Sequence, residues 1–484
     1  MSLPSLIEIV PLTQPVRADI TVPGSKSITN RALVLAALAQ GETTLQGALW
    51  SEDTQVMVEC LQELGFMVNV EQDPNESCNR TITVYGLGGQ VPRGGTVEQP
   101  MELFVGNAGT AARFLAAMVC LGEGVYRLHG VPRMHERPQA ALFQSLRQLG
   151  YRIDATNDKL PALIHGAGPK PGARCTVSID ASSQFASALL LSAGVGGWSI
   201  EVKGENADES PYVVMTSELV KVFPHRGGKF QIEPDASSGS YFWAAGWFVS
   251  GGLWDPPKVS AAQIRSTFSG RRKGKAGEQW EAATGMLFEN HTRVNVQEWP
   301  ESRWQIDSRF IDYAVPDKRK AGLIFAERLR MAKAVPVISR SGDLGDSIMT
   351  LIAIAPLAEK ATETAIKFTD LGRLRVQECE RVVALRTELT KCGAKVIETG
   401  DTLEVFPSQL HGAEIETYND HRMAMCFAIL GLKVPGIKIK NPACVKKTFP
   451  NFFQKLAVAP PHGLGATILD ASGRKLTHEE LFAD

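Results

Sequence analysis

Cations stand beside glycine and small hydroxyl residues at points where the sequence predicts that helices begin. In the segment Pro23-Gly-Ser-Lys-Ser-Ile-Thr-Asn-Arg31, Lys26 ends a turn, and Ser27 and Arg31 lie four residues apart on one face of the predicted helix. A hydroxyl beside a guanidinium fork binds a carboxylate or a phosphate well. The Gly-Ser-Lys run lacks the G-x-x-x-x-G-K-[ST] spacing of a Walker loop, so we do not predict an ATP site.

A second candidate anion site is the glycine turn Asn107-Ala-Gly-Thr110, which directly precedes an apolar helical run. Glycine lets backbone N–H groups approach a ligand, and the first N–H groups of a helix lack intrahelical partners. They carry partial positive charge, to which Arg113 adds a cation in the first turn. Taken alone, the stretch is equally compatible with an ordinary helix start.

Further segments combine cations, carboxylates or hydroxyls with predicted turns and helix starts. They are His135-Glu-Arg-Pro138, Ala181-Ser-Ser-Gln-Phe185, Glu378-Cys-Glu-Arg381, Asn419-Asp-His-Arg422 and Lys446-Lys-Thr-Phe-Pro450. Each of them alone is more often a helix cap or a surface ion pair. Together they predict a site that encloses substrates with several negative charges.

The bulk composition limits the class of protein. The 484 residues are too many for one ordinary core and predict two or three domains. With 44% hydrophobic and 21% charged residues, the chain is typical of a globular protein. The formal net charge of -1 argues against nucleic acid as a partner.

The sequence also predicts where the protein acts. The beginning of the chain resembles no signal peptide, and no apolar run reaches the roughly 18 residues of a membrane span. The 8 cysteines show no C-x-x-C spacing, so we expect neither a zinc site nor a disulfide framework. We therefore expect a cytoplasmic protein with no membrane partner.

The elements that must position these residues follow one pattern, in which an amphipathic helix ends near a glycine and a short strand follows. Helices are predicted over 27–39, 52–64, 138–149 and 376–392, with glycines at 41, 65, 150 and 393. This repetition indicates duplicated α/β units. Residues 252–345 interrupt the pattern; within them 321–334 predicts a helix, and the basic run 271–275 predicts a solvated loop.

The motifs as a set resemble those of the 5-enolpyruvylshikimate-3-phosphate synthases, a family of the enolpyruvyl transferase superfamily. From about residue 8 to 457, the chain carries in the family's order PGSKS-x-x-NRAL, LF-x-GNAGTA-x-R, PRM-x-ERP, SSQF, DASS-x-SYF, YNDHRMAMCF and KTFP. The resemblance implies an α/β (α+β) fold of two domains, each with three βαβαββ units in an inside-out barrel. It places 1–22 plus 236–460, with the enlarged segment 252–345, in the first domain. The second domain is 23–235, and 461–484 is a C-terminal tail.

The resemblance also implies a reaction. In the family, the enolpyruvyl group of phosphoenolpyruvate passes to the 5-hydroxyl of shikimate 3-phosphate and phosphate leaves, on the route to chorismate and the aromatic amino acids. Family motifs assign catalysis to Lys26, Asp346 and Glu378, with both carboxylates in acid/base work. No cofactor or metal is implied, and we expect a monomer.

The same motifs assign the binding residues. Phosphoenolpyruvate is expected at Lys26, Asn107, Gly109, Arg137, Arg381, Arg422 and Lys447. Shikimate 3-phosphate is expected at Lys26, Ser27, Arg31, Ser182, Ser183, Gln184, Tyr212, Asp346 and Gln377. With Gly109 and Thr110 in place, we also expect inhibition by glyphosate.

Departures from the family pattern concentrate on the acceptor side. Gln377 stands where the family usually has Lys, Arg373 where it has Asn, and Glu209 where it has Ser near the shikimate phosphate. Phe114 replaces a common proline. One alternative is therefore an enolpyruvyl transferase with a different shikimate-like acceptor, and another is a non-catalytic anion-binding protein. A UDP-N-acetylglucosamine enolpyruvyl transferase is disfavoured, because the loop 134–137 lacks the cysteine of that family.

Overall fold

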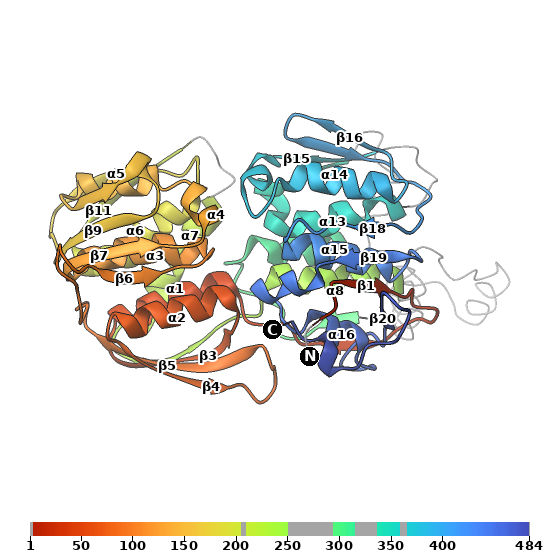
Figure 1. Cartoon of the computed structure of the whole chain (residues 1–484), viewed down its shortest axis with the longest axis horizontal. Helices are drawn as coiled ribbons and strands as arrows, with labels where there is room; N and C mark the ends of the chain where they lie inside the picture. Colours follow the sequence, from red (N-terminus) through yellow and green to blue (C-terminus); the bar gives the residue numbers. More distant parts are fainter. Residues whose placement is uncertain (1–2, 205–209, 250–293, 315–335, 359–364, 484) are drawn as a thin grey trace, which may run out of the picture.

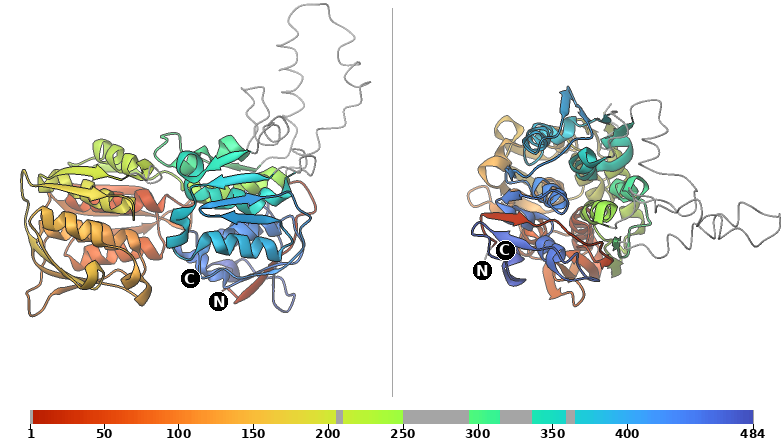
Figure 2. Two further views of the ribbon diagram at one scale, coloured as in Figure 1. Left: turned by 90° about the horizontal axis from the view of Figure 1, so that it is seen from above. Right: turned by 90° about the vertical axis from the view of Figure 1, so that its right-hand side faces the viewer.

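The computed structural model describes residues 3–204, 210–249, 294–314, 336–358 and 365–483. Two lobes lie side by side in both Figure 1 and the left view of Figure 2. Their buried apolar side chains form two separate clusters. The cluster of the first lobe draws on residues 3–22 and 241–483, and that of the second lobe on 28–232. The chain therefore passes between the lobes twice.

The second lobe contains the strands β3 to β12 and the helices α1 to α7. Its strands are β3 (Gln40–Leu49), β4 (Met67–Gln72), β5 (Asn79–Leu87), β6 (Met101–Phe104), β7 (Glu123–His129), β8 (Arg152–Ala155), β9 (Ala162–Ala167), β10 (Arg174–Ser178), β11 (Ser199–Lys203) and β12 (Gly228–Gln231). Its helices are α1 (Lys26–Leu38), α2 (Glu52–Glu63), α3 (Gly109–Met118), α4 (Pro132–Glu136), α5 (Ala140–Gln148), α6 (Ser183–Gly196) and α7 (Ser210–Val222).

The first lobe combines the two ends of the chain. Its strands are β1 (Leu6–Ile9), β2 (Ala18–Ile20), β13 (Val294–Val296), β14 (Val337–Ser339), β15 (Ile366–Thr369), β16 (Val396–Thr399), β17 (Thr402–Val405), β18 (Glu414–Ile415), β19 (Ile437–Lys440) and β20 (Ile468–Asp470). Its helices are α8 (Ala236–Val249), α11 (Ile311–Ala314), α13 (Ile348–Ile354), α14 (Arg381–Lys391), α15 (His421–Gly431) and α16 (Phe452–Ala457). Short helical turns include η4 (Ile306–Phe310), η5 (Arg340–Leu344), η6 (Gly345–Ser347), η8 (Gly372–Val376) and η9 (Pro442–Lys447).

Four-stranded sheets with one common pattern occur in both lobes. Their strand orders are β12-β3-β5-β4, β6-β7-β9-β8, β14-β15-β17-β16 and β18-β19-β1-β20. In each sheet the first two strands run parallel, and the remaining neighbours are antiparallel. The parallel pairs β10–β11 and β2–β13 complete the sheets of the described residues.

Helices form the centre of each lobe. In the second lobe α1, α3 and α6 pack against one another, as α8, α13 and α15 do in the first lobe. Every residue of α3 is buried, and in α15 only Arg422 is not fully buried. Such helices are apolar on all sides because they are surrounded by protein. Their backbone groups are therefore satisfied along their length and unsatisfied only at their ends.

The predicted helices 27–39, 52–64 and 138–149 correspond to α1, α2 and α5. The prediction over 376–392 was too long at its beginning, because α14 starts only at Arg381. Residues 372–376 form the turn η8, and the carboxylate of Glu380 caps α14 by accepting from the N–H of Val383. The predicted helix 321–334 and the basic run 271–275 lie outside the described residues.

The expectation of a C-terminal tail over 461–484 needs correction. Strand β20 pairs antiparallel with β1, and Leu464 and Leu481 are buried in the core of the first lobe. These apolar side chains give the segment a reason to fold against the lobe. Among the described residues, no helix combines the length and the apolar character that a membrane crossing requires.

Candidate active site

A pocket lies between the two lobes and receives side chains from both. The second lobe contributes Lys26, Ser27, Arg31, Thr110, Arg113, Arg137, Ser182, Ser183, Gln184 and Tyr212. The first lobe and its crossover contribute Asp235, Ser238, Asp307, Arg340, Asp346, Arg373, Gln377, Glu378, Arg381, His421 and Arg422.

The central helices direct their N-terminal ends at this pocket. Lys26, Ser183 and His421 are the first residues of α1, α6 and α15, and all three line the pocket. Thr110 and Ser237, the second residues of α3 and α8, line it too. Helix N-termini carry unsatisfied N–H groups and partial positive charge. The fold therefore makes the pocket an anion-binding site even before any side-chain cation is considered.

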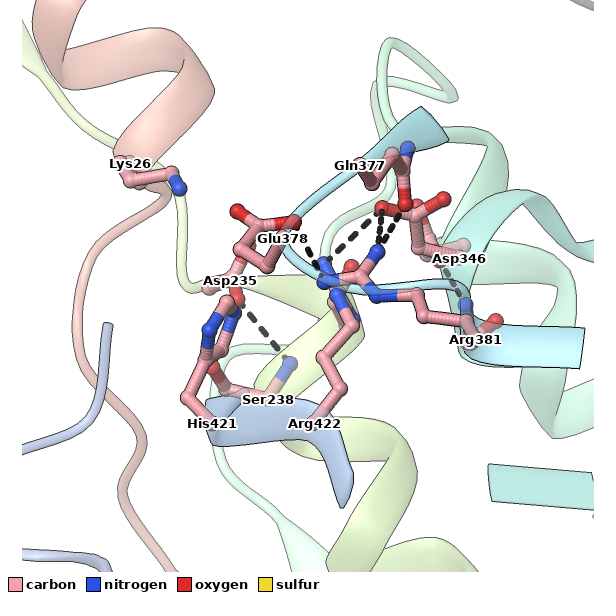
Figure 3. Close-up of polar contacts among 12 residues, drawn as sticks. Lys26, Asp235, Ser238, Asp346, Gln377, Glu378, Arg381, His421 and Arg422 are labelled. Atoms are coloured by element: carbon pink, nitrogen blue, oxygen red, sulfur yellow. Dashed lines mark hydrogen bonds and ion pairs between the residues drawn. The ribbon is translucent and has the colours of Figure 1, made fainter. Parts of the chain in front are cut away.

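Asp346 is one of the carboxylates that line the pocket (Figure 3). Its Oδ1 lies 2.9 Å from Nη2 of Arg340, and its Oδ2 lies 3.4 Å from Nη2 of Arg422 and 3.6 Å from Nη1 of Arg381. Burial by itself would raise the pKa of Asp346, but Arg422, Arg340 and Arg381 together hold this pKa well below its usual value. Asp346 is therefore ionised at neutral pH.

Glu378 is another lining carboxylate and lies between two cations. Its Oε2 is 2.7 Å from Nη2 of Arg381, and its Oε1 is 3.2 Å from Nζ of Lys447. Burial opposes the charge of Glu378, but Arg381 and Lys447 hold its pKa well below the usual value. Figure 3 shows Lys26 extending toward Glu378 from α1 of the opposite lobe.

Arg381 anchors the carboxylate network. Its guanidinium is 1% exposed, and its Nε donates to Asp420 at 2.7 Å. Asp420 in turn caps α15 by accepting from the N–H of Arg422 at 2.9 Å. Arg381 also donates to the side-chain oxygen of Gln377. The residue that replaces the family's usual lysine is thus held beside Glu378 by the same arginine.

Two arginines of the second lobe have neutral partners instead, whereas Nζ of Lys26 lies 3.1 Å from Oδ2 of Asp53. Arg31 donates to Thr216 Oγ1 at 2.7 Å and to Ser187 Oγ at 3.0 Å. Arg113 donates to Gln184 Oε1 at 3.3 Å. Burial lowers the pKa of Arg31 to about 10. Burial also lowers the pKa of Arg113 well below its usual value, with repulsion from nearby arginines as a further cause.

Gly109 allows Arg113 and Arg137 to approach the turn at the start of α3. A Cβ at this position would stand 2.3 Å from Nη1 of Arg113 and 2.7 Å from Nη2 of Arg137. Arg137 donates from Nη1 to the backbone oxygen of Asn107 at 3.1 Å. A side chain at residue 109 would therefore displace the cations themselves. Phe114, which replaces the family's proline, lies with its ring centre 5.2 Å from the guanidinium carbon of Arg31.

Most residues that the sequence assigns to the site line this pocket. They are Lys26, Ser27, Arg31, Arg137, Ser182, Ser183, Gln184, Tyr212, Asp346, Gln377, Glu378, Arg381 and Arg422. Asn107, Gly109 and Lys447 lie directly behind the lining, where they contact Arg137 or Glu378. Glu209 lies outside the described residues. Arg373 lines the pocket and reaches the other lobe, where its Nη1 lies 3.5 Å from the backbone oxygen of Asp180.

Several lining residues were missed as site residues. Arg340 contacts Asp346, and Asp307 lies close behind the turn that carries Asp346. His421 is buried, which lowers its pKa well below the usual value and keeps the imidazole neutral. His421 and Arg422 stand next to each other in YNDHRMAMCF, so the sequence already contained a signal for His421. Arg340 and Asp307 lie in 252–345, where neither the sequence pattern nor the resemblance predicted a site residue.

The lobes and their pocket define a two-lobed α/β enzyme that acts on anionic substrates, and the fold is that of the enolpyruvyl transferases. An EPSP synthase from Acinetobacter baumannii matches with a TM-score of 0.62 and 20% identity, covering 96% of this chain and 100% of that one. The enolpyruvyl transferase NikO from Streptomyces tendae matches with a TM-score of 0.59 and 16% identity, covering 99% and 100%.

Sequence comparison gives the family. The model of the family EPSP synthase (3-phosphoshikimate 1-carboxyvinyltransferase) matches residues 10–253 and 327–456. A 3-phosphoshikimate 1-carboxyvinyltransferase from Trichormus variabilis is 35% identical, covering 93% of this chain and 98% of the relative. One from Opitutus terrae is 36% identical, covering 94% and 98%. The chain belongs to the EPSP synthase family, whose members are transferases of the shikimate pathway.

Proposed function

We propose that this chain transfers the enolpyruvyl group of phosphoenolpyruvate to the 5-hydroxyl of shikimate 3-phosphate and releases phosphate. The observation that carries the proposal is the placement of Asp346 and Glu378 in one pocket with cations from both lobes. Two anionic substrates need such cations, and a transfer between them needs acid/base groups at the point where they meet.

Phosphoenolpyruvate fits the side of the pocket where cations of both lobes converge. Arg137 comes from the second lobe, and Arg381, Arg422 and Lys447 come from the first. The carboxylates of Asp346 and Glu378 balance the charge of these first-lobe cations. A bound carboxylate or phosphate adds negative charge beside Glu378 and Asp346, which raises their pKa values. Substrate binding thereby makes a protonated carboxyl accessible for acid catalysis.

The chemical steps require proton transfers on both substrates. One base removes the proton of the 5-hydroxyl as its oxygen bonds to C2 of phosphoenolpyruvate, and one acid protonates the methylene carbon C3. In the second step C3 loses a proton, the C2–O bond to phosphate breaks, and the vinyl ether forms. We assign these transfers to Asp346 and Glu378 jointly. Lys26, which extends toward Glu378 from the second lobe (Figure 3), is the third catalytic residue of the proposal.

Shikimate 3-phosphate fits the hydroxyl-rich side of the second lobe. Ser182 caps α6 by accepting from the N–H of Gln184 at 3.2 Å, and Ser183 is the first residue of that helix. A helix N-terminus with two hydroxyls suits a phosphate group. Ser27, Arg31 and Tyr212 line the same side. Gln377 and Asp346 face it from the first lobe.

We further propose three βαβαββ units in each domain, with domain boundaries at 1–22 plus 236 onward and at 23–235. The two separate cores and the repeated strand order support this division. A cytoplasmic location and a monomeric state complete the proposal.

The second candidate function is enolpyruvyl transfer to a different shikimate-like acceptor. Arg373 and Gln377 favour it, because they differ from the family pattern and both line the pocket. A phosphate-release assay with phosphoenolpyruvate and either shikimate 3-phosphate or unphosphorylated shikimate separates the two candidates. We expect turnover with the phosphorylated acceptor. Absence of turnover with it, under conditions in which the protein is folded, would defeat the main proposal.

A further inference from the structure

The short turn η4 supports the loop that carries Asp346. Gln305, which precedes η4, accepts the N–H of Ala236 at the start of α8 through Oε1 at 3.0 Å. At the other end of the turn, Arg309 donates from Nη1 to the backbone oxygen of Gly342 at 2.7 Å. The turn η4 thus connects the beginning of α8 to the loop 340–347.

Asp307, the second residue of η4, makes the central contact. Its Oδ1 accepts the backbone N–H of Ser347, the neighbour of Asp346, at 2.6 Å. Asp307 is 4% exposed and Ser347 is fully buried, so water does not compete freely for this hydrogen bond. The hydroxyl of Ser347 closes the same turn by donating to the backbone oxygen of Leu344 at 2.6 Å.

Gly345 permits this close approach. Its φ of +55° lies in the left-handed region that favours glycine. A Cβ there would stand 2.6 Å from Cγ2 of Ile306 and 2.9 Å from Oδ2 of Asp307. The residue before Asp346 is therefore suited both to the turn and to the contact with η4.

The surroundings of Asp307 distinguish it from an ordinary structural carboxylate. Burial raises its pKa to about 6, against attraction from Arg422 and with repulsion from Asp346 and Asp235. These groups come from α15, from η6 and from the residue before α8. Asp307 itself also lines the pocket.

We propose that Asp307 is a positioning residue for Asp346: its carboxylate holds the N–H of Ser347 and thereby fixes the direction in which Asp346 faces Arg340, Arg422 and the substrates. This inference rests on the proposed function for its catalytic consequence. A small displacement of a reacting group costs about a hundredfold in rate, so the support is worth a measurable part of the turnover.

The test compares Asp307→Ala, Asp307→Asn and a control at Glu388, a fully buried carboxylate bound by Lys391 and Tyr418. We expect Asp307→Ala to lower kcat about 10- to 100-fold while KM for phosphoenolpyruvate stays within about threefold. Asp307→Asn keeps an acceptor for Ser347 without the charge, and it mimics the neutral carboxyl. At pH 8 the kcat of Asp307→Asn should be about tenfold below the wild-type value. Below pH 6 it should approach the wild-type value, because the wild-type Asp307 is itself protonated there. Glu388→Gln should leave kcat and its pH dependence unchanged.

Hydrogen exchange provides the readout that does not depend on turnover. The amide of Ser347 should exchange faster in Asp307→Ala than in wild type, and not in Glu388→Gln. An unchanged Ser347 exchange rate, or a ratio of wild-type to Asp307→Asn kcat that is the same at every pH, overturns the inference. Should Asp307→Ala not fold, Asp307→Asn gives both readouts. Wild-type protein without turnover would count against the proposed function, while Ser347 exchange would still decide the positioning role.

Discussion

The two lobes bring arginines to the same pocket in opposite electrostatic states. In the first lobe, Arg381 is surrounded by Asp420, Glu378 and Asp346. In the second lobe, Arg31 and Arg113 donate to hydroxyl, amide and backbone oxygens, and no ion pair with a carboxylate is present for them among the described residues. The pKa values follow this difference: burial opposes the charge in every case, but carboxylates raise the pKa of Arg381, whereas the pKa of Arg31 falls.

This difference indicates a division of labour. Arginines that are already neutralised by carboxylates hold those carboxylates ionised and correctly placed for proton transfer. Arginines with only neutral partners are available to a ligand's negative charge, because an anion gains their full attraction in a buried site. In the proposed reaction, the first lobe therefore supplies the acid/base carboxylates, and we call it the acid/base side; the second lobe supplies arginines with neutral partners for a substrate anion, and we call it the receptor side.

The largest expected effect is the loss of a first-lobe carboxylate. Glu378→Gln should lower kcat by about two to four orders of magnitude, because the acid/base group is removed while the shape of the side chain remains. Calorimetry should show that phosphoenolpyruvate and shikimate 3-phosphate still bind. Glu388→Gln, a buried carboxylate of the same lobe outside the pocket, is the matched control. Near-normal turnover of Glu378→Gln would remove Glu378 from the acid/base pair.

The next prediction compares how much a variant in each lobe lowers the free energy of unfolding. Asp420→Asn keeps the helix cap but removes charge from the partner of Arg381, so the free energy of unfolding should fall by about 3 kcal/mol. Arg31→Met in the second lobe should change it by less than about 1 kcal/mol, because the buried cation has no carboxylate to lose. Denaturant titration measures both. Equal losses would contradict the proposed difference between the lobes.

Arg31→Met should still affect function, and its effect tests whether the second lobe binds shikimate 3-phosphate. A charge-assisted hydrogen bond contributes about 1.5–3 kcal/mol, so shikimate 3-phosphate should bind about 10- to 100-fold more weakly. Calorimetric titration with the phosphorylated acceptor measures the change. Unchanged affinity would place the acceptor elsewhere in the pocket.

Gly109→Ala tests how tightly the receptor side is arranged. The added Cβ would meet Arg113 and Arg137, so KM for phosphoenolpyruvate should rise about tenfold, while kcat at saturation should fall less. Inhibition by glyphosate should weaken more than phosphoenolpyruvate binding does. Turnover of the wild-type protein that is unchanged at millimolar glyphosate would contradict the expected sensitivity.

The smallest effect concerns His421 on the acid/base side. Its folded-state pKa lies below the unfolded value of about 6.5, so the unfolded chain binds more protons and stability falls as the pH drops below 6.5. His421→Gln removes this contribution. Between pH 7 and pH 5.5, the variant should therefore lose about 1 kcal/mol less than wild type. A parallel loss in both proteins would show that His421 does not stay neutral when folded.

Local sequence signals predicted the positions of α1, α2 and α5 well, because glycine at a helix end and an apolar face act within a few residues. The same locality explains the errors. The apolar pattern from 376 did not reveal that η8 precedes α14, and residues 461–483 gave no local sign that β20 would pair with β1, more than four hundred residues earlier.

The site shows the same contrast. Lys26, Ser183 and His421 were recognisable as polar groups at helix starts, since helix N-termini and small hydroxyl or charged residues are coupled locally. Arg340 and Asp307 were not, because their importance comes from contacts with Asp346 and Ser347. Nothing in their own segments marks them.

By itself the sequence determined which side chains stand at the starts of helices, and through its motifs it determined the family. Only the tertiary structure decided that the central helices of two lobes aim their N-termini at one pocket. It also decided that Arg340, Arg381 and Arg422 of the first lobe are paired with carboxylates, while Arg31 and Arg113 have neutral partners. The physical reason is that hydrogen bonds of a helix start depend on neighbouring residues, whereas desolvation and charge pairing depend on whatever the fold brings within a few ångströms.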